Sequence, residues 1–166
     1  MAIYHSLLAE LEMESEATKK ILQSVPDEQW NWKPHDKSYS IGALATHIAD
    51  IYGWSDIMIH KDQLDFANTD YVAPEVANSS DLMRTFNENL AHAKVALQNA
   101  KDEQFSENWK MRNGEQIYFE LPKNVVFRTW VLNHIVHHRA QLGVYLRLLE
   151  IPVPSTYGPS ADLQAM

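Results

Sequence analysis

Cysteine is absent from this sequence of 166 residues. Its absence excludes disulfide bonds, thiolate metal sites and a cysteine nucleophile, and it leaves histidine, aspartate and glutamate as the strong metal ligands. The sequence also lacks an apolar run long enough to cross a bilayer. The first ten residues, MAIYHSLLAE, lack the basic and apolar regions of a secretory signal. We therefore expect a cytoplasmic protein without a membrane partner.

Basic residues are scarce and do not cluster. The 14 Lys and Arg residues are outnumbered by 22 Asp and Glu residues, which gives a formal net charge of −8. Nucleic acids and anionic membranes require clustered Lys and Arg to displace counterions from phosphates. The composition therefore argues against such partners, and we expect a small-molecule substrate.

Glycine and proline are also few, with five and seven residues, and they fall almost entirely between four segments of helical periodicity. These segments predict helices from about residue 2 to Val25, from the cap Ser40 to Lys61, from a cap at Ser79 or Ser80 through Leu97, and from after Pro122, with Asn124 as the cap, to Glu150. We therefore expect residues 1–166 to form a single all-α domain, a four-helix bundle.

Two connections between the expected helices have features of their own. The segment from Asp62 to Asn78 is long, which predicts a crossover between the second and third helices. The stretch NWKMRNGEQIYFEL alternates around the pair Asn113-Gly114. An Asn-Gly pair is typical of a two-residue hairpin, so we expect a small β-hairpin before the last helix.

The fourth expected helix carries histidines where a purely structural helix would carry Leu or Ile. One face of this helix, followed in alternating steps of four and three residues, holds Phe127, Val131, His134, His138, Gln141 and Tyr145. His134 and His138 lie one turn apart, about 6 Å along the axis, so both imidazoles can reach one ion. The third ligand must come from a facing element, and His47 in the second helix is the candidate. Asp50, three residues later, is a candidate for orienting an imidazole.

A structural role for these histidines remains open at this point, because a His-x-x-x-His pair also occurs in helices without metal. Glu14 lies on the predicted core face of the first helix and is a candidate acid or base. Alternatively, that helix is rotated so that Leu8 faces inward and Glu14 is solvated. Arg139 either binds a substrate carboxylate or pairs with an acid on a neighbouring helix.

Three further candidates surround the histidine pair in sequence. His137, one position before His138, either donates a hydrogen bond or lines a substrate pocket. Gln141, one turn beyond His138, either lines the pocket or bridges to a neighbouring helix. Trp130 is expected in the core. The tail that contains Tyr157 either covers the open end of the bundle or frays.

The segment from His134 to Gln141 reads HIVHHRAQ, and together with His47 it resembles the DinB/YfiT-like family of bundle proteins, which are unrelated to the DNA polymerase of similar name. In that family an HxxHHRGQ-like signature on the last helix supplies two metal ligands, and a histidine in the middle of the second helix supplies the third. Ala140 replaces the usual glycine and does not affect a ligand. Softer similarities, from Trp30 to the proline-rich tail, span most of the chain.

The resemblance implies a bundle that is often dimeric and binds nickel, zinc or another divalent ion through His47, His134 and His138. Family members of known activity resemble transferases or isomerases that use a low-molecular-weight thiol. Three neutral imidazoles leave the ion an open position, which is the catalytic arrangement. We therefore expect a metal-dependent enzyme, a thiol-dependent S-transferase for small electrophiles in stress response or detoxification. The alternatives are a metal-dependent hydrolase with Glu14 as base and a non-catalytic, metal-stabilised dimeric bundle.

Overall fold

The computed structural model describes residues 2–68 and 71–162, and this part of the chain is mostly helical with a small three-stranded sheet. Its long helices are α1 (Ile3–Leu22), α2 (Ile41–His60), α3 (Ser79–Asn99) and a continuous last helix made of α4 (Lys123–Val126), the π-helical turn η4 (Phe127–Leu132) and α5 (Asn133–Leu148). Short 3₁₀ helices form η1 (Asp27–Gln29), η2 (Phe66–Asn68) and η3 (Asp102–Ser106).

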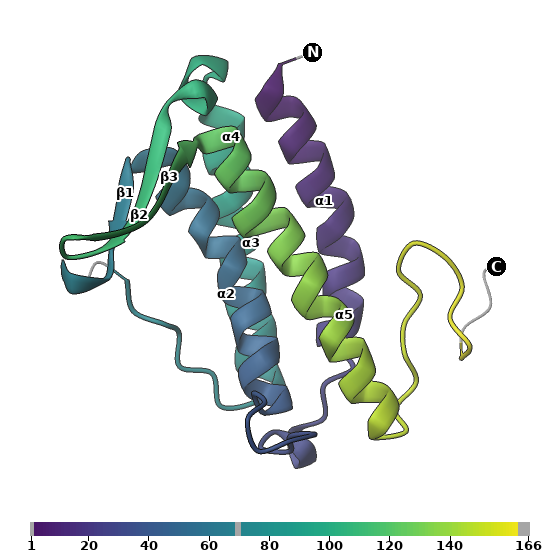
Figure 1. Cartoon of the computed structure of the whole chain (residues 1–166). Coiled ribbons are helices and arrows are strands. Elements are labelled where there is room, and N and C mark those ends of the chain that lie inside the picture. The colour runs from purple at the N-terminus through teal and green to yellow at the C-terminus, as the bar shows by residue number, and fades with distance from the viewer. Residues whose placement is uncertain (1, 69–70, 163–166) are drawn as a thin grey trace.

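The long helices pack side by side along most of their length (Figure 1). Helix α1 contacts α3 and α5, and α2 contacts the same two helices from the other side. Residues 71–78 then run along the outside of α2 to reach the start of α3 at the opposite end of the molecule (Figure 1). This long connection is the crossover that the sequence predicts, and it places Tyr71 and its neighbours against α2.

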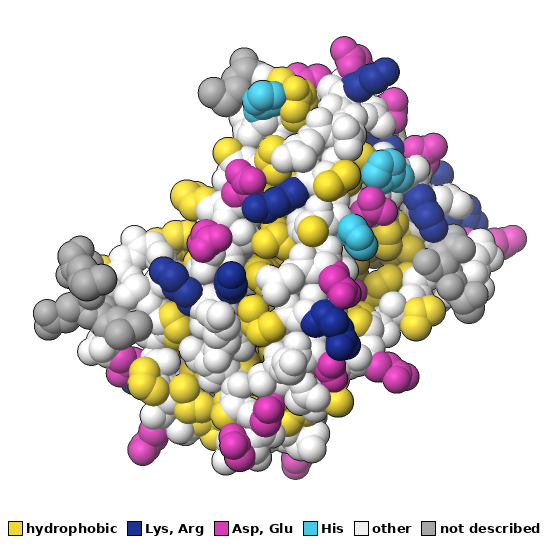
Figure 2. All heavy atoms as spheres, turned by 180° about the vertical axis from the view of Figure 1, so that it is seen from behind, with side chains coloured by type: hydrophobic (Ala, Val, Ile, Leu, Met, Phe, Trp, Pro, Cys, Tyr) yellow, Lys and Arg dark blue, Asp and Glu magenta, His cyan; other side chains and the backbone are white. Residues whose placement is uncertain are grey.

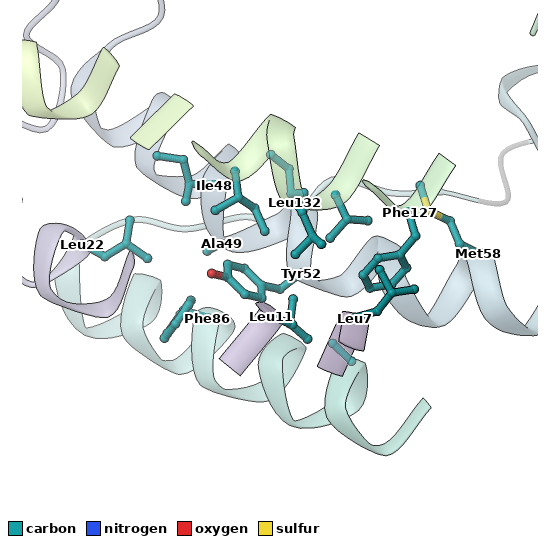
Figure 3. Packing of buried hydrophobic residues seen from close by; sticks show 14 of the residues in the cluster. Leu7, Leu11, Leu22, Ile48, Ala49, Tyr52, Met58, Phe86, Phe127 and Leu132 are labelled. Atoms are coloured by element: carbon teal, nitrogen blue, oxygen red, sulfur yellow. The ribbon is translucent and has the colours of Figure 1, made fainter. Parts of the chain in front are cut away.

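Apolar side chains from all the long helices fill the space between them. Tyr52 of α2 lies among Leu11, Ala49 and Phe86, and its ring meets that of Phe86 edge to face at 5.1 Å (Figure 3). All of these side chains are buried. The predicted core face of α1 is correct, because Glu14 is buried together with Leu7 and Leu11, whereas Leu8 is only half-buried.

The helix starts differ from the sequence predictions at two of three capped positions. Ser40 caps α2 as predicted, and its hydroxyl accepts a hydrogen bond from the Ala43 amide at 3.2 Å. Helix α3 is capped by Asn78, whose side chain accepts from the Asp81 amide at 2.9 Å, rather than by a serine. The last helix begins at Lys123, after Pro122 with a non-helical ψ of 140°, and no side chain caps it, because Asn124 lies inside the first turn.

The sheet contains β1 (Gln63–Asp65), β2 (Asn108–Asn113) and β3 (Gln116–Pro122), in that order, with β1 parallel to β2 and β2 antiparallel to β3. Strands β2 and β3 lie where the sequence predicts a hairpin, but the turn residues are Gly114 and Glu115 rather than Asn113 and Gly114. Gly114 has a φ of 57°, which suits the first central position of a type II′ turn. Strand β1, only three residues long, is too short to show periodicity.

The buried face of the last helix changes phase at η4. Within this turn the buried residues are Phe127 and Val131, as predicted, together with Leu132. A π-helical turn holds more residues than an α-helical one, so the helix beyond it is rotated relative to a regular 3.6-residue period. The buried positions that follow are Ile135, Arg139, Leu142 and Leu146. The prediction that His134 and His138 continue the core face is therefore wrong, and both lie half-buried beside it.

No helix in the ranges that the structure describes combines the length and apolar character needed to span a membrane. On the face shown in Figure 2, acidic and basic side chains alternate with apolar ones, and no continuous basic patch is seen.

Candidate metal centre

The imidazoles of His47 on α2 and of His134 and His138 on α5 converge on one point. The His134 Nε2 atom lies 3.4 Å from Nε2 of His47 and 2.9 Å from Nε2 of His138. One ligand nitrogen from each ring lies within 4.8 Å of those of the other two. The predicted pairing of His134 and His138 on one helix with His47 on a facing helix is therefore the arrangement that the fold produces.

Burial and mutual repulsion favour the neutral form of each imidazole. Burial first, and then the neighbouring His138 and His134, lower the pKa of His47 to about 4. The pKa of His134 is also lowered to about 4, mainly by burial and then by His138. The pKa of His138 is lowered by burial, while its hydrogen bond to Gln141 acts in the opposite direction. At neutral pH all three rings therefore offer nitrogen lone pairs.

Gln141 fixes the orientation of His138. Its Oε1 atom lies 2.7 Å from His138 Nδ1, on the ring nitrogen that faces away from the cluster. An amide oxygen only accepts hydrogen bonds, so Nδ1 carries the proton and Nε2 of the neutral ring presents its lone pair to the other histidines. Gln141 is exposed, and this hydrogen bond within α5 is neither the pocket lining nor the bridge to a neighbouring helix that the sequence suggested.

The donor set fits a divalent metal ion. Ligands about 2.0–2.1 Å from an ion in tetrahedral geometry are roughly 3.4 Å from one another, which is close to the separation of His47 and His134. Two Nε2 lone pairs at 2.9 Å, as in His134 and His138, repel unless a proton or a cation lies between them. Neutral imidazoles suit zinc, nickel, copper and iron alike, so the donor set does not choose among these metals.

Aromatic side chains enclose the imidazoles. The Trp54 ring lies 5.6 Å from that of His47 and 5.4 Å from that of His134, and the Trp130 ring lies 6.1 Å from that of His134. Trp130 is half-buried and stacks on Phe119 of β3 at 5.0 Å, so it joins the sheet to the histidines. These rings shield the histidines from water, which strengthens electrostatic interactions at the site.

Asp50 has other partners than the predicted imidazole. Its Oδ2 atom accepts hydrogen bonds from Nε1 of Trp54, at 3.1 Å, and from the hydroxyl of Tyr71. Burial raises the pKa of the Asp50 carboxyl, while the bonds from Tyr71 and Trp54 oppose that effect. Asp50 therefore holds the Trp54 wall and the crossover segment in place. No sequence pattern marks Tyr71 as a partner of Asp50, because the crossover has no periodicity from which to locate it.

A groove of about 690 Å³ opens beside His47. It lies between α2, the loop before α2 and the crossover, and its lining includes Trp30, Tyr39, Asp50, Tyr71 and Glu75. Gly42 allows the Trp30 indole to approach α2, since a Cβ atom there would lie 2.4 Å from Trp30 Cε2. The groove gives a small molecule access to the side of the histidine cluster.

Arg139 and Glu14 form a separate buried pair. Arg139 Nη2 lies 2.6 Å from Glu14 Oε2, and the exposed fractions of the two side chains are 3% and 7%. Arg139 Nη1 also donates to Thr18 Oγ1 at 3.2 Å. Of the two predicted roles of Arg139, the structure therefore shows the ion pair with a neighbouring helix. The alternative of a solvated Glu14 is wrong, and its carboxylate is not part of the histidine cluster.

The C-terminal tail packs on the face of α5 away from the groove. The Tyr157 hydroxyl accepts from Arg139 Nη2 at 2.6 Å and donates to Glu14 Oε2 at 2.8 Å. Asp162 accepts from the Val153 amide and pairs with Arg147. No tail residue up to 162 lines the groove, so the described part of the tail is anchored but does not cover the histidines.

The remaining histidines lie on the surface. His137 is exposed, with its ring centroid 4.8 Å from that of His138, and it borders a shallow hollow with Trp130 and His134. The histidines outside this region are all exposed: His5, His35, His60 and His92.

Comparison with known proteins identifies the family of this chain. Residues 2–164 match the model of the DinB family. The chain belongs to the DinB family. It is 25% identical over 153 residues to the uncharacterized protein YrdA of Bacillus subtilis strain 168. The aligned region covers 91% of this chain and 86% of YrdA.

Solved DinB-like structures share the fold. A DinB-like protein from Bacillus subtilis, YjoA, superposes with a TM-score of 0.71 at 15% identity, over 97% of this chain and 99% of that one. A DinB-like protein from Bacillus cereus ATCC 10987 gives a TM-score of 0.67 at 21% identity, over 92% and 97% of the two chains. At these identities the likeness concerns the fold, so the reaction of this DinB family member has to be argued from its own residues.

Proposed function

We propose that this DinB family member is a four-helix-bundle enzyme that depends on one divalent ion, nickel or zinc, and acts as a thiol-dependent S-transferase on small electrophiles. His47, His134 and His138 hold the ion. The observation that carries the proposal is the convergence of their Nε2 atoms beside a groove large enough for a small molecule. Detoxification or a stress response is the role that such an activity suits.

The ion, when bound, supplies Lewis acidity that lowers the pKa of a thiol or a water molecule. The side chains of the protein supply the metal ligands, their orientation and the shielding of the site from water. Its imidazoles are neutral at pH 7, Gln141 orients His138, and Trp54 and Trp130 limit access of water. Because the protein has no cysteine, the thiol must come from solution.

The proposed reaction is a nucleophilic substitution. The thiol sulfur forms a bond to the electrophilic carbon, the bond from that carbon to a halide breaks, and the halide leaves with the electron pair. The thiol proton passes to solvent. No oxidant or reductant is needed.

Hydrolysis by an activated water is the second enzymatic possibility, and the position of Glu14 weighs against the version in which this residue is the base. Its carboxylate binds Arg139 and Tyr157 and is absent from the histidine cluster. The test compares two reactions of the zinc- or nickel-loaded protein. Conjugation of an aryl halide that requires added thiol supports transfer, whereas thiol-independent cleavage of an aryl ester supports hydrolysis.

Two exposed apolar rings that lie together support the dimeric alternative. Phe66 of η2 and Tyr118 of β3 are each at least 45% exposed, and their ring centroids are 6.4 Å apart. We propose that these two rings form part of a homodimer contact. Sedimentation of the parent chain and of Tyr118→Asp tests it, with a dimer expected only for the parent.

A further inference from the structure

The groove beside His47 is acidic and has no balancing base. Among the described residues that line it, Asp50 and Glu75 carry carboxylates, His47 is the one imidazole, and neither lysine nor arginine is present. Glu75 is exposed and makes no ion pair with a described residue. Apart from an ion held by the three histidines, an anionic ligand would therefore meet two like charges and no opposite one among these residues.

Asp50 is the more informative of the two carboxylates. It is 93% buried, and both of its hydrogen bonds, from Trp54 and Tyr71, go to the same oxygen, Oδ2. Its Oδ1 atom has no hydrogen bond to any described residue. Oδ1 is not among the described side-chain atoms that are both fully buried and without a hydrogen bond, so it is open to the groove, where a cationic group from solution can bind it.

The walls around Asp50 suit a cation with an apolar body. Trp30, Tyr39 and Tyr71 present aromatic rings to the groove, and aromatic faces attract ammonium groups. Burial without a neighbouring positive charge raises the pKa of the Asp50 carboxyl, which agrees with the absence of a cationic partner within the chain.

Asp50 also lies at a useful distance from the proposed reaction centre. It follows His47 by three residues on α2, which is about 4.5 Å along the helix axis. Both side chains line the same groove. A small molecule held at Asp50 by one end therefore presents its other end to the histidine cluster.

We infer that the small-molecule ligand of this groove carries a protonated amine that binds Asp50 Oδ1, with an aromatic or apolar body packed against Trp30, Tyr39 and Tyr71. This inference rests on the proposed function for its place in the reaction, since it names the substrate class of the same site. The charge preference itself depends on Asp50 and not on the ion.

The test is calorimetric binding to the zinc-loaded protein of three ligands with the same ring and different charge: 2-phenylethylamine, 2-phenylethanol and 3-phenylpropanoate. We expect the amine to bind at least about tenfold more tightly than the alcohol, because it gains a charged hydrogen bond. The acid should bind most weakly once the ion has been removed by a chelator, since no ion then attracts its carboxylate. In chelator-treated protein, equal affinities, a preference for the acid or no binding of the amine would overturn the inference.

The variant Asp50→Asn tests whether the preference for the amine depends on the Asp50 carboxylate. The amide oxygen of Asn still accepts from Trp54 or Tyr71, and its circular dichroism melting curve reports whether the fold is kept. We expect the amine and the alcohol to bind this variant equally. The control Asp56→Asn, at an exposed position six residues further along α2, should keep the parent's preference. A preference that survives in folded Asp50→Asn contradicts the assignment. Should this variant not fold, the order of the three ligands on the parent still decides the charge claim.

Repeating the titrations on chelator-treated protein separates this inference from the proposed function. Retention of the amine preference without the ion supports the role of Asp50 whether or not the protein is a metalloenzyme. A preference that vanishes with the ion overturns it. Added thiols then test the connection to the reaction, since cysteamine is expected to bind more tightly than 2-mercaptoethanol to the metal-loaded protein.

Discussion

The Arg139 guanidinium lies 2.6 Å from the Glu14 carboxylate in the interior, while the preceding residue, His138, points to the histidine cluster. Two successive residues of α5 therefore serve different sites. Arg139 joins α5 to α1 and to the tail, and His138 joins α5 to α2. The signature in the sequence thus contains a structural residue next to a candidate metal ligand.

The Arg139–Glu14 pair is expected to be a stability determinant. Removing one partner of a buried pair leaves an uncompensated charge, so Arg139→Ala should lower the free energy of unfolding by about 3 kcal/mol or more. Urea denaturation measures this. The matched control is Arg128→Ala, which removes an exposed pair with Glu10 and should cost less than about 1 kcal/mol. Equal losses in the two variants would contradict the buried-pair account.

The anchoring of the tail depends on the Tyr157 hydroxyl. Tyr157→Phe removes the donor to Glu14 and the acceptor for Arg139, and we expect a loss of about 1 kcal/mol together with faster proteolysis after residue 150. Limited proteolysis followed by mass spectrometry detects the change. Tyr118→Phe, on the exposed face of β3, is the control and should digest like the parent. An unchanged digestion rate in Tyr157→Phe would refute the anchor.

Gln141 should affect metal affinity without being a ligand. Gln141→Ala frees His138 to rotate and to change tautomer, and loss of such a supporting partner typically weakens metal binding by about tenfold or more. Competition with a chromophoric chelator measures the affinity. Gln98→Ala on α3 serves as the exposed control. An affinity for Gln141→Ala equal to that of the parent would show that the hydrogen bond has no such role.

Without metal, stability should fall on acidification. His47 and His134 have pKa values lowered to about 4 in the fold, against 6.5 in the unfolded chain, so between these values the unfolded state binds more protons. Chelator-treated protein should therefore be most stable above pH 6.5 and lose on the order of 1 kcal/mol by pH 4, a figure reduced for solvent screening of half-buried rings.

The control for this pH dependence is the double variant His47→Gln and His134→Gln, whose stability should vary less over the same window. Asp50, with its raised pKa, contributes a slope of opposite sign in both proteins, so its contribution cancels in the comparison. Thermal unfolding of the parent and of the double variant from pH 4 to pH 7 measures the two pH dependences. A steeper fall in the double variant than in the parent would contradict the assignment.

The sequence predicts much of this structure because apolar periodicity and turn residues act locally. The four long helices, the core face of α1 and the Ser40 cap all follow from such patterns. The convergence of His47 with His134 and His138 was predictable from helical spacing and a family signature.

The features that the sequence did not predict depend on tertiary contacts. The π-helical turn at η4 rotates the last helix, and nothing in the local sequence of Phe127–Leu132 marks it. Strand β1 forms only because β2 lies beside it. Tyr71 reaches Asp50 from a connection without periodicity, and Trp54 joins Asp50 to the histidines.

The most direct test of the central claim is the metal content of tag-free protein by elemental mass spectrometry, after incubation with nickel and zinc. The parent and His92→Ala, which changes an exposed histidine on α3, should hold close to one ion per chain. His47→Ala, His134→Ala and His138→Ala should each hold much less while keeping the parent's circular dichroism spectrum. A parent chain that retains no metal, or histidine variants that retain as much as the parent, would contradict the account.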